Sequence, residues 1–272
     1  MDWVTVGNAN NVADANGLGS VAYTYQIGKY EVTNAQYGAF LNAAAQTDSY
    51  GLYNSNMSGL GITRSGSSGS YSYSVTTALA NRPVEYVSWY DAARFANWMM
   101  NGQGGGSTET GAYTLNGATT GVILANAGAQ VYLPTENEWY KAAYYNAANQ
   151  TYSQYPNGQN SITTADANYG FSVGSATDVG TYINDGSFYG TFDQGGNVWE
   201  WNDGVKHGWA RGRRGGGWNS NGAYLLSYIQ DDGGDPAQEF NYIGFRLAAV
   251  PEPSSMLLMM LAGGAMLIRR KR

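Results

Sequence analysis

The chain has 272 residues, a formal charge of −6, no cysteine and one histidine. Without cysteine it cannot form disulfides or thiolate metal sites, and one histidine excludes clusters of imidazole ligands. Charged residues make up only 12% of the chain, whereas 38 glycines and 23 tyrosines indicate a loop-rich domain held by aromatic rings with polar tips. This composition favours an exported surface protein, and the acidic charge argues against nucleic-acid binding.

The pattern of apolar residues predicts a strand over residues 21–30 and then three amphipathic helices, the first over residues 34–46. Each helix begins with a capping box, in which an N-cap hydroxyl is matched by a side chain three positions later: Thr33 with Gln36, Ser88 with Asp91, and Thr135 with Glu138. We expect a long loop over residues 48–79, a hairpin joining 113–115 to 121–124, and a closing strand over 244–248. These elements describe one mixed α+β domain, residues 1–249.

The segment from Asp193 to Trp201, with the sequence DQGGNVWEW, places two carboxylates among glycines and tryptophans. Glycines weaken both helices and strands, so we interpret the segment as a folded loop in which Asp193 and Glu200 direct their oxygens at one target. The target is either a metal ion or a buried hydrogen-bond network. Because thiolates and clustered imidazoles are excluded, a bound metal would be a hard cation such as calcium.

The C-terminal residues 250–272 form a separate segment. Pro251, Glu252 and Pro253 precede fifteen uncharged residues, 254–268, and the chain ends in four basic residues. Fifteen residues are fewer than the roughly 20 that cross a membrane, and the basic end would stay on the cytoplasmic side. A short buried core helix is the alternative, which the terminal charges disfavour.

This tail resembles the PEP-CTERM sorting signal of Gram-negative bacteria. The resemblance implies that an exosortase recognises the tail, that residues 254–268 form a hydrophobic helix in the inner membrane before processing, and that the protein then reaches the periplasm, the cell surface or the extracellular space. Export requires an N-terminal signal peptide, and the first residues lack a basic region followed by an apolar run. We therefore expect the natural chain to begin upstream of Met1.

Six ordered motifs resemble the formylglycine-generating enzyme, or sulfatase-modifying factor, family over residues 3–249. The motifs are residues 30–34 (YEVTN), 82–89 (RPVEYVSW), 133–139 (LPTENEW), 196–201 (GNVWEW), 214–218 (RGGGW) and 244–246 (GFR). The resemblance implies a C-type-lectin-like α+β fold with little regular secondary structure and with bound calcium.

The family enzyme oxidises a substrate cysteine to formylglycine with two active-site cysteines, copper and oxygen. The resemblance places Ser220 and Leu225 at the positions of these cysteines. Neither side chain can bind Cu(I) as a soft thiolate does, so we expect no copper and no catalytic residues of this type.

The resemblance also implies a calcium site. Asp193 and Glu200 would supply side-chain oxygens, and Gly196 and Val198 would supply backbone carbonyls. The alternative is that Glu200 only accepts hydrogen bonds within the loop. A second family calcium site would begin at Asn168 and Tyr169, and the sequence leaves it undecided.

These observations predict a non-catalytic, calcium-stabilised, exported surface domain that binds a glycan or a protein. The alternatives are an oxidoreductase relative with altered chemistry and a structural component of the extracellular matrix. We expect the tryptophans of the family motifs to lie in the core, namely Trp89, Trp139, Trp199 and Trp201. The tyrosines of the polar loop are the expected ligand contacts, namely Tyr50, Tyr53, Tyr71 and Tyr73.

Overall fold

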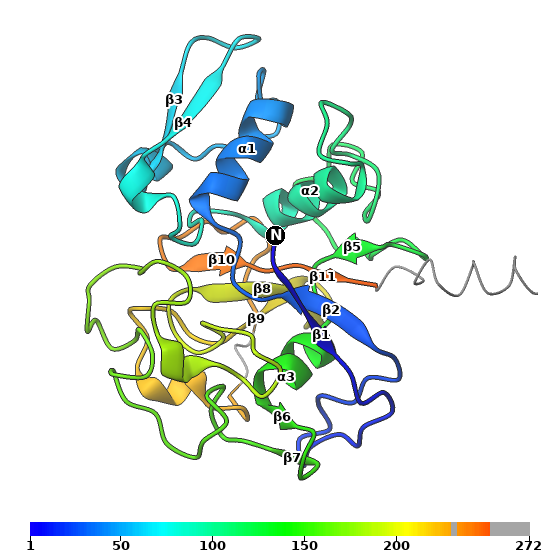
Figure 1. Ribbon diagram of the computed structural model, residues 1–272. Helices are drawn as coiled ribbons and strands as arrows, with labels where there is room; N and C mark the ends of the chain where they lie inside the picture. The colour runs from blue at the N-terminus through cyan, green and yellow to red at the C-terminus, as the bar shows by residue number, and fades with distance from the viewer. Residues whose placement is uncertain (230–232, 251–272) are drawn as a thin grey trace, which may run out of the picture.

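The computed structural model describes residues 1–229 and 233–250, and the hydrophobic helix expected at 254–268 lies outside these ranges. Two sheets form the centre of the domain, with α1 and α2 on one side and α3 on the other (Figure 1). The described part has three α-helices: α1 (Asn34–Ala44), α2 (Trp89–Met100) and α3 (Glu136–Tyr144). Mixed architecture with few helices confirms the expected α+β class.

The larger sheet is antiparallel and has its last strand in an inner position. In the order β1-β2-β11-β5, its strands are β1 (Trp3–Val6), β2 (Tyr25–Gly28), β11 (Ala248–Ala249) and β5 (Val131–Tyr132). Ala248 lies between Ile27 of β2 and Tyr132 of β5. The end of the chain thus joins two segments that are far apart in sequence.

The second sheet carries the glycine- and tryptophan-rich loop. Its order is β10-β8-β9, with β10 (Ile243–Phe245), β8 (Trp199–Lys206) and β9 (Ala210–Arg214). β10 runs parallel to β8, and Gly244 lies opposite Glu200 in this register. Two small hairpins complete the strands: β3 (Ile62–Ser65) with β4 (Ser72–Val75), and β6 (Tyr145–Asn146) with β7 (Thr151–Tyr152). The short 3-10 helices are η1 (Ser55–Gly59), η2 (Thr77–Leu79), η3 (Ile183–Asp185) and η4 (Gly222–Leu225).

All three helices begin where the capping boxes predict. In each box the N-cap hydroxyl accepts the N3 backbone N–H, while the N3 side chain accepts the N-cap N–H. Each box satisfies two donors that a helix start otherwise leaves unpaired. The local signal was therefore sufficient for these three elements.

Three other expectations were wrong in detail. The strand expected over 21–30 is limited to Tyr25–Gly28, and Tyr23, which lies before it, is 48% exposed. The expected 113–124 hairpin is reduced to one isolated bridge between Tyr113 and Ala125. The loop at 48–79 contains the β3–β4 hairpin, whose exposed serines gave no apolar alternation.

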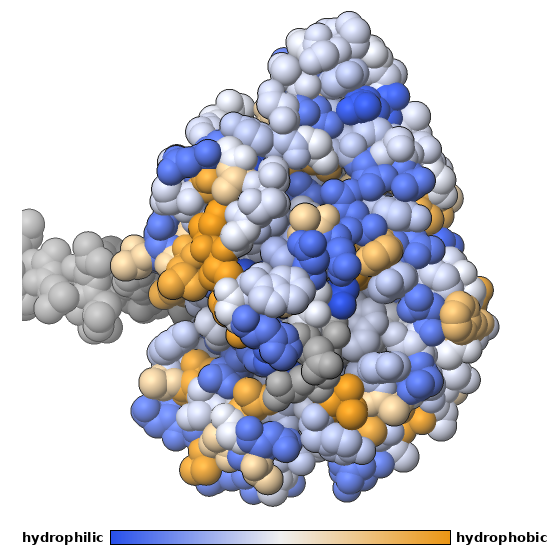
Figure 2. Space-filling model, turned by 180° about the vertical axis from the view of Figure 1, so that it is seen from behind, coloured by the Kyte–Doolittle hydropathy of each residue, from blue (hydrophilic) through white to orange (hydrophobic). Residues whose placement is uncertain are grey.

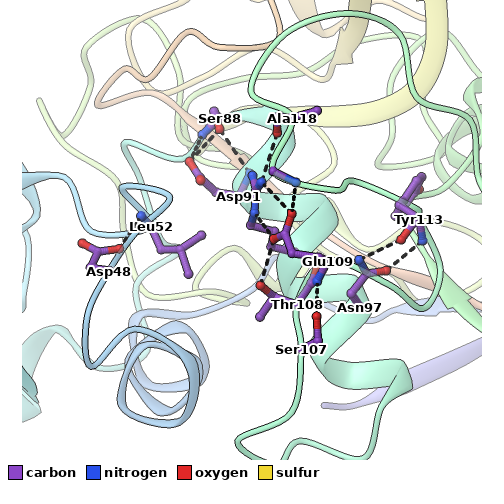
Figure 3. A network of polar contacts seen from close by, with 12 residues as sticks. Asp48, Leu52, Ser88, Asp91, Asn97, Ser107, Thr108, Glu109, Tyr113 and Ala118 are labelled. Carbon is purple, nitrogen blue, oxygen red and sulfur yellow. Dashed lines mark hydrogen bonds and ion pairs between the residues drawn. The ribbon is translucent and has the colours of Figure 1, made fainter. Parts of the chain in front are cut away.

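Helix α2 connects the core to the loop that follows it. Arg94 donates to the carboxylate of Glu109 (2.7 Å) and to the carbonyl of Ala118 (3.0 Å), and Asn97 exchanges hydrogen bonds with the backbone of Tyr113 (Figure 3). Arg94 and Asn97 are fully buried. Because buried polar groups are costly to leave unpaired, these bonds hold the loop in one conformation.

Candidate functional site

The predicted loop leads into β8 and places the Glu200 side chain in the interior, with no exposed surface. Arg246 binds both carboxylate oxygens: its Nε lies 2.6 Å from Oε2 and its Nη2 lies 2.6 Å from Oε1. Trp139 of α3 donates its indole N–H to Oε2 over 2.7 Å. Burial alone would lower the pKa of Arg246, but the Glu200 carboxylate raises it above its ordinary value.

The Arg246 guanidinium also binds backbone carbonyls from two other segments. Its Nη1 donates to Gly28 (2.9 Å) and Lys29 (3.3 Å), and its Nη2 donates to Phe192 (2.8 Å). All five N–H donors of the guanidinium are thus used. Arg246 connects the end of β2, the loop before Asp193 and the start of β8.

Asp193 and Glu31 add two more buried carboxyl groups beside this ion pair. Asp193 has φ 60° and accepts the backbone N–H of Gly180 over 2.5 Å. Burial raises the pKa of Asp193 to about 6, and burial together with the neighbouring Asp193 raises the pKa of Glu31 well above its ordinary value. Glu31 Oε1 accepts a hydrogen bond from Asn197, whereas its Oε2 is buried without a partner. Three carboxyl groups therefore interact with one guanidinium.

Gly196 and Val198 occupy the turn between Asp193 and Glu200. Gly196 has φ 88°, and a Cβ on it would lie 2.3 Å from the carbonyl oxygen of Asn168, so only glycine fits. The Val198 side chain is fully buried against Ala176 and Trp218. The structure thus places all four predicted calcium ligands in one short buried stretch.

The oxygens of this stretch have the chemistry that calcium requires. Each carboxylate oxygen can accept two hydrogen bonds or metal contacts. Glu200 Oε2 already accepts two hydrogen bonds, whereas Oε1 accepts one and can still serve as a ligand through a single oxygen. The excess of carboxyl groups over guanidinium also suits a divalent cation. The described residues contain no group of three or more acidic, histidine or cysteine side chains arranged to hold a metal, so carbonyls and water would complete such a site.

The two positions that correspond to the family cysteines differ in their surroundings. Ser220 is 8% exposed, and its Oγ accepts hydrogen bonds from Trp199 Nε1 (3.0 Å) and from the Gly217 N–H (3.0 Å). Neither bond is to a carboxylate or a histidine, so no general base among the described residues is hydrogen-bonded to the hydroxyl. Leu225 is fully buried in η4, and its Cδ1 and the Ser220 Cβ both lie within 3.4 Å of the place where a Cβ on Gly216 would stand.

Ser220 lies in an open cleft of about 550 Å³, which we call the aromatic cleft. Its walls carry four aromatic rings and two amides, with one arginine: Trp199, Tyr224, Tyr242, Phe171, Asn219, Asn221 and Arg213. Phe171 is 64% exposed and Tyr224 is 46% exposed, so their rings are accessible to a ligand. Tyr224 packs edge-on against Trp199, with ring centroids 5.6 Å apart.

The sequence missed these wall residues because they come from segments that are far apart in the chain, namely residue 171, strands β8 and β9, residues 219–224 and residue 242. Of the tyrosines expected as ligand contacts, Tyr53 and Tyr73 are instead buried, since their hydroxyls donate to the backbone of Ile62 and Ala45. The motif tryptophans are buried as expected, although Trp199 also lines the aromatic cleft. Glu31 and Arg246 belong to the family motifs at 30–34 and 244–246, but the sequence analysis did not name them as site residues. The signal for Arg246 was a charged residue inside the apolar strand expected over 244–248.

The fold is that of a formylglycine-generating-enzyme-like domain, and three solved structures share it. CarF aligns with a TM-score of 0.64 and 23% identity, covering 93% of this chain and 99% of CarF. Treponema denticola variable protein 1 aligns with a TM-score of 0.63 and 21% identity, covering 92% and 95% of the two chains. PvdO from Pseudomonas aeruginosa aligns with a TM-score of 0.54 and 17% identity, covering 92% and 94%. At these identities the likeness establishes the fold alone.

The sequence itself matches the Sulfatase-modifying factor enzyme 1-like domain over residues 8–250 and the PEP-CTERM protein-sorting motif over residues 249–272. The chain therefore belongs to the sulfatase-modifying factor family and ends in a PEP-CTERM sorting tail. It is also 27% identical over 186 residues to hercynine oxygenase of Mycobacterium tuberculosis (strain ATCC 25618 / H37Rv), covering 65% of this chain and 37% of that protein. The chain thus spans little more than a third of this relative.

Proposed function

We propose that this domain is a non-catalytic binding module and that its ligand site is the aromatic cleft. The observation that carries the proposal is the position of Ser220, which lies in the cleft where the family resemblance expects a reactive cysteine. The chain contains no cysteine at all, so the thiolate chemistry of the family has no substitute elsewhere. What remains at this position is an accessible pocket with binding chemistry only.

The walls of the cleft suit a glycan. Exposed aromatic rings stack on the apolar faces of sugars, and amide side chains donate and accept hydrogen bonds to hydroxyls. The volume of about 550 Å³ lies within the range of small-ligand sites. An exposed loop of another protein is the second possible ligand, because rings and amides are also typical of protein-binding surfaces.

A glycan array probed with the whole chain in detergent tests this proposal. Tyr224→Ala and Phe171→Ala should each weaken binding roughly tenfold. The magnitude is taken from nucleic-acid sites, in which a base stacked on an aromatic side chain contributes about 1–3 kcal/mol. Phe188→Ala is the matched control, because Phe188 is 49% exposed and does not line the cleft. Equal losses in the control and the cleft variants would reject the cleft as the site.

Two alternatives predict other outcomes. If the domain is an oxidoreductase with altered chemistry, adding copper and a cysteine-containing sulfatase peptide should produce aldehyde, and that product would overturn the non-catalytic proposal. If the domain is a structural matrix component, it should self-associate or bind matrix polymer without loss in the cleft variants. Hercynine oxygenase is named for an oxygenase activity, and this chain corresponds to only part of that protein.

We also propose that calcium stabilises the loop that supports the cleft. Asp193 and Glu200 would hold the ion through carboxylate oxygens, and Gly196 and Val198 would hold it through carbonyls. A ligand that binds only the folded state raises the melting temperature, so a chelator should lower it. Asp193→Ala should remove this calcium dependence, and a chelator effect of the same size in the variant would argue against the site.

The tail supports a role outside the cytoplasm. We propose that exosortase-type machinery recognises the PEP-CTERM motif, with residues 254–268 in the inner membrane, and that the domain faces the periplasm before release to the cell surface or beyond. No helix among the described residues is long and apolar enough to cross a membrane. Deleting residues 251–272 should abolish membrane association in cell fractions, and an unchanged membrane fraction would argue against this role.

A further inference from the structure

The point at which the sorting tail leaves the domain is fixed. β11 ends at Ala249, and the N–H of Val250 donates to the carbonyl of Gln130 over 2.9 Å, so the exit lies beside the loop before β5. Only Pro251, Glu252 and Pro253 separate this point from the uncharged residues 254–268. At roughly 3.3–3.6 Å per residue, three residues and their connections span at most about 14 Å.

The surface beside this exit is apolar. Val250 is 39% exposed, and Leu124 and Val122, six and eight residues before its partner Gln130 in the chain, are 66% and 38% exposed; we call these three side chains with Gln130 the exit face. Figure 2 shows hydrophobic surface next to the place where the grey trace begins. A scattered exposed leucine needs no explanation, but several apolar side chains gathered at one place indicate a contact surface.

The same stretch also lacks charge. No Asp, Glu, Lys or Arg occurs between Glu109 and Glu136, although the chain as a whole is acidic. A charged side chain would resist transfer from water into the boundary between lipid headgroups and acyl chains, whereas an uncharged loop with exposed aliphatic side chains gains from it.

The loop is also held in place before any contact forms. Tyr90 of α2 donates its hydroxyl to the carbonyl of Gly121 (2.6 Å), and Asn126 donates its N–H to the carbonyl of Ala112 (2.7 Å). Arg211 donates a hydrogen bond to the carbonyl of Ile123. Arg94, which lies in α2 like Tyr90, donates a hydrogen bond to the carbonyl of Ala118 (Figure 3). The exit face is therefore preformed, so contact with a flat surface requires little further ordering.

We propose that the exit face lies on the lipid bilayer while the tail is anchored, with Leu124 and Val122 among the headgroups. This inference rests on the proposed anchoring of residues 254–268. With a tether of about 14 Å at most, the domain cannot move away from the membrane, and the surface around the exit is the one that meets it. A bilayer is favoured over a protein partner because the tail itself directs this face toward lipid.

Site-specific labelling of the whole chain tests the inference, and the absence of native cysteine makes the labelling clean. The protein carrying Leu124→Cys is labelled with an environment-sensitive nitrobenzoxadiazole dye and reconstituted into vesicles of phosphatidylethanolamine and phosphatidylglycerol. Nitroxide lipids should quench this dye at least twofold more than a dye at Ile183→Cys. Ile183 is the matched control, since it is an aliphatic side chain, 81% exposed, in η3 and distant from the exit (Figure 1).

The outcomes separate this inference from the anchoring proposal. Flotation with vesicles and equal quenching at both positions would overturn the exit-face contact alone. Failure to float would overturn the anchoring and the contact together. A blue shift that appears only when exosortase is added, without quenching by nitroxide lipids, would overturn the bilayer in favour of a protein partner.

A second variant tests the contact without a dye. Val122→Asp with Leu124→Asp should release the domain from the surface, so protease access at the 251–253 linker in vesicles should rise several-fold, with an unchanged thermal melt in detergent. Ile183→Asp should leave protease access unchanged. Equal access in parent and double variant would contradict the contact.

Discussion

Replacing Arg246 should be among the most damaging single changes in the domain. Arg246→Met keeps most of the side-chain length but removes the guanidinium that binds Glu200, and it leaves the carbonyls of Gly28, Lys29 and Phe192 without this donor. Removing one partner of a buried ion pair costs about 3–5 kcal/mol, because the other charge stays buried without compensation. This is a large fraction of the roughly 5–15 kcal/mol that stabilises a typical domain.

Urea unfolding followed by tryptophan fluorescence measures this loss. With a denaturant dependence of about 2.5 kcal/mol per molar urea, a loss of about 4 kcal/mol lowers the midpoint by about 1.5 M. Arg64→Met is the matched control, because the Arg64 side chain is 31% exposed in its pair with Asp48. Because the buried Asp48 keeps the backbone N–H groups of Leu52 and Tyr53 as donors when Arg64 is lost, this change should cost less than Arg246→Met.

A double variant decides whether uncompensated charge is the cause. Adding Glu200→Gln to Arg246→Met removes the buried negative charge, so the double variant should be more stable than Arg246→Met alone. Two results would contradict this reasoning. One is a cost of less than about 1 kcal/mol for Arg246→Met. The other is that Glu200→Gln destabilises the Arg246→Met protein by as much as it destabilises the parent protein, which would mean that Arg246 does not neutralise the Glu200 charge.

Three further predictions concern stability. Burial raises the pKa of Glu85 to about 8, although the hydrogen bond from Trp218 lowers it. The folded state therefore favours the protonated acid, and the stability of the protein falls as the pH rises from 4.5 to 8. Glu85→Gln should stabilise the protein by about 5 kcal/mol at most at pH 8.5 and change its stability little at pH 4.5, which urea titrations at both pH values would measure. Gly196→Ala should cost at least about 2 kcal/mol more than Gly174→Ala, because both have positive φ but only the Gly196 Cβ would meet backbone; similar midpoints would argue against that close approach. Phe95→Ala should cost about 3–5 kcal/mol, since its ring packs against four other aromatic rings, and a shift in melting temperature of less than a few degrees would count against its central place in the core.

Patterns of residues that are close in sequence predicted more of the fold than of the site. The capping boxes at Thr33, Ser88 and Thr135 lie within four consecutive residues each, so the sequence alone located all three helix starts. The β3–β4 hairpin was missed because residues such as Ser65 and Ser72 pair across it on the solvent side, and exposed serines do not alternate with apolar residues.

The site depended on contacts between distant residues. Asp193 and Glu200 are both buried, but Glu200 lies in strand β8 and only residues 193–198 form the expected loop. Their partners Glu31 and Arg246 are far away along the chain, and no local pattern states which charged residues meet. The walls of the aromatic cleft were missed for the same reason, and calcium binding remains a prediction.

The inner position of β11 has a consequence for the order of events during synthesis. In the sheet that the structure describes, β2 and β5 are joined through β11 at the end of the domain, and Arg246, two residues before β11, completes the buried charge pair. Contacts between sequence ends form late, because a long loop must close first. The chain therefore cannot reach its final structure until almost all of it has been made. Under the export proposed above, the chain would pass a narrow translocation channel before β11 is in place and would complete its fold afterwards.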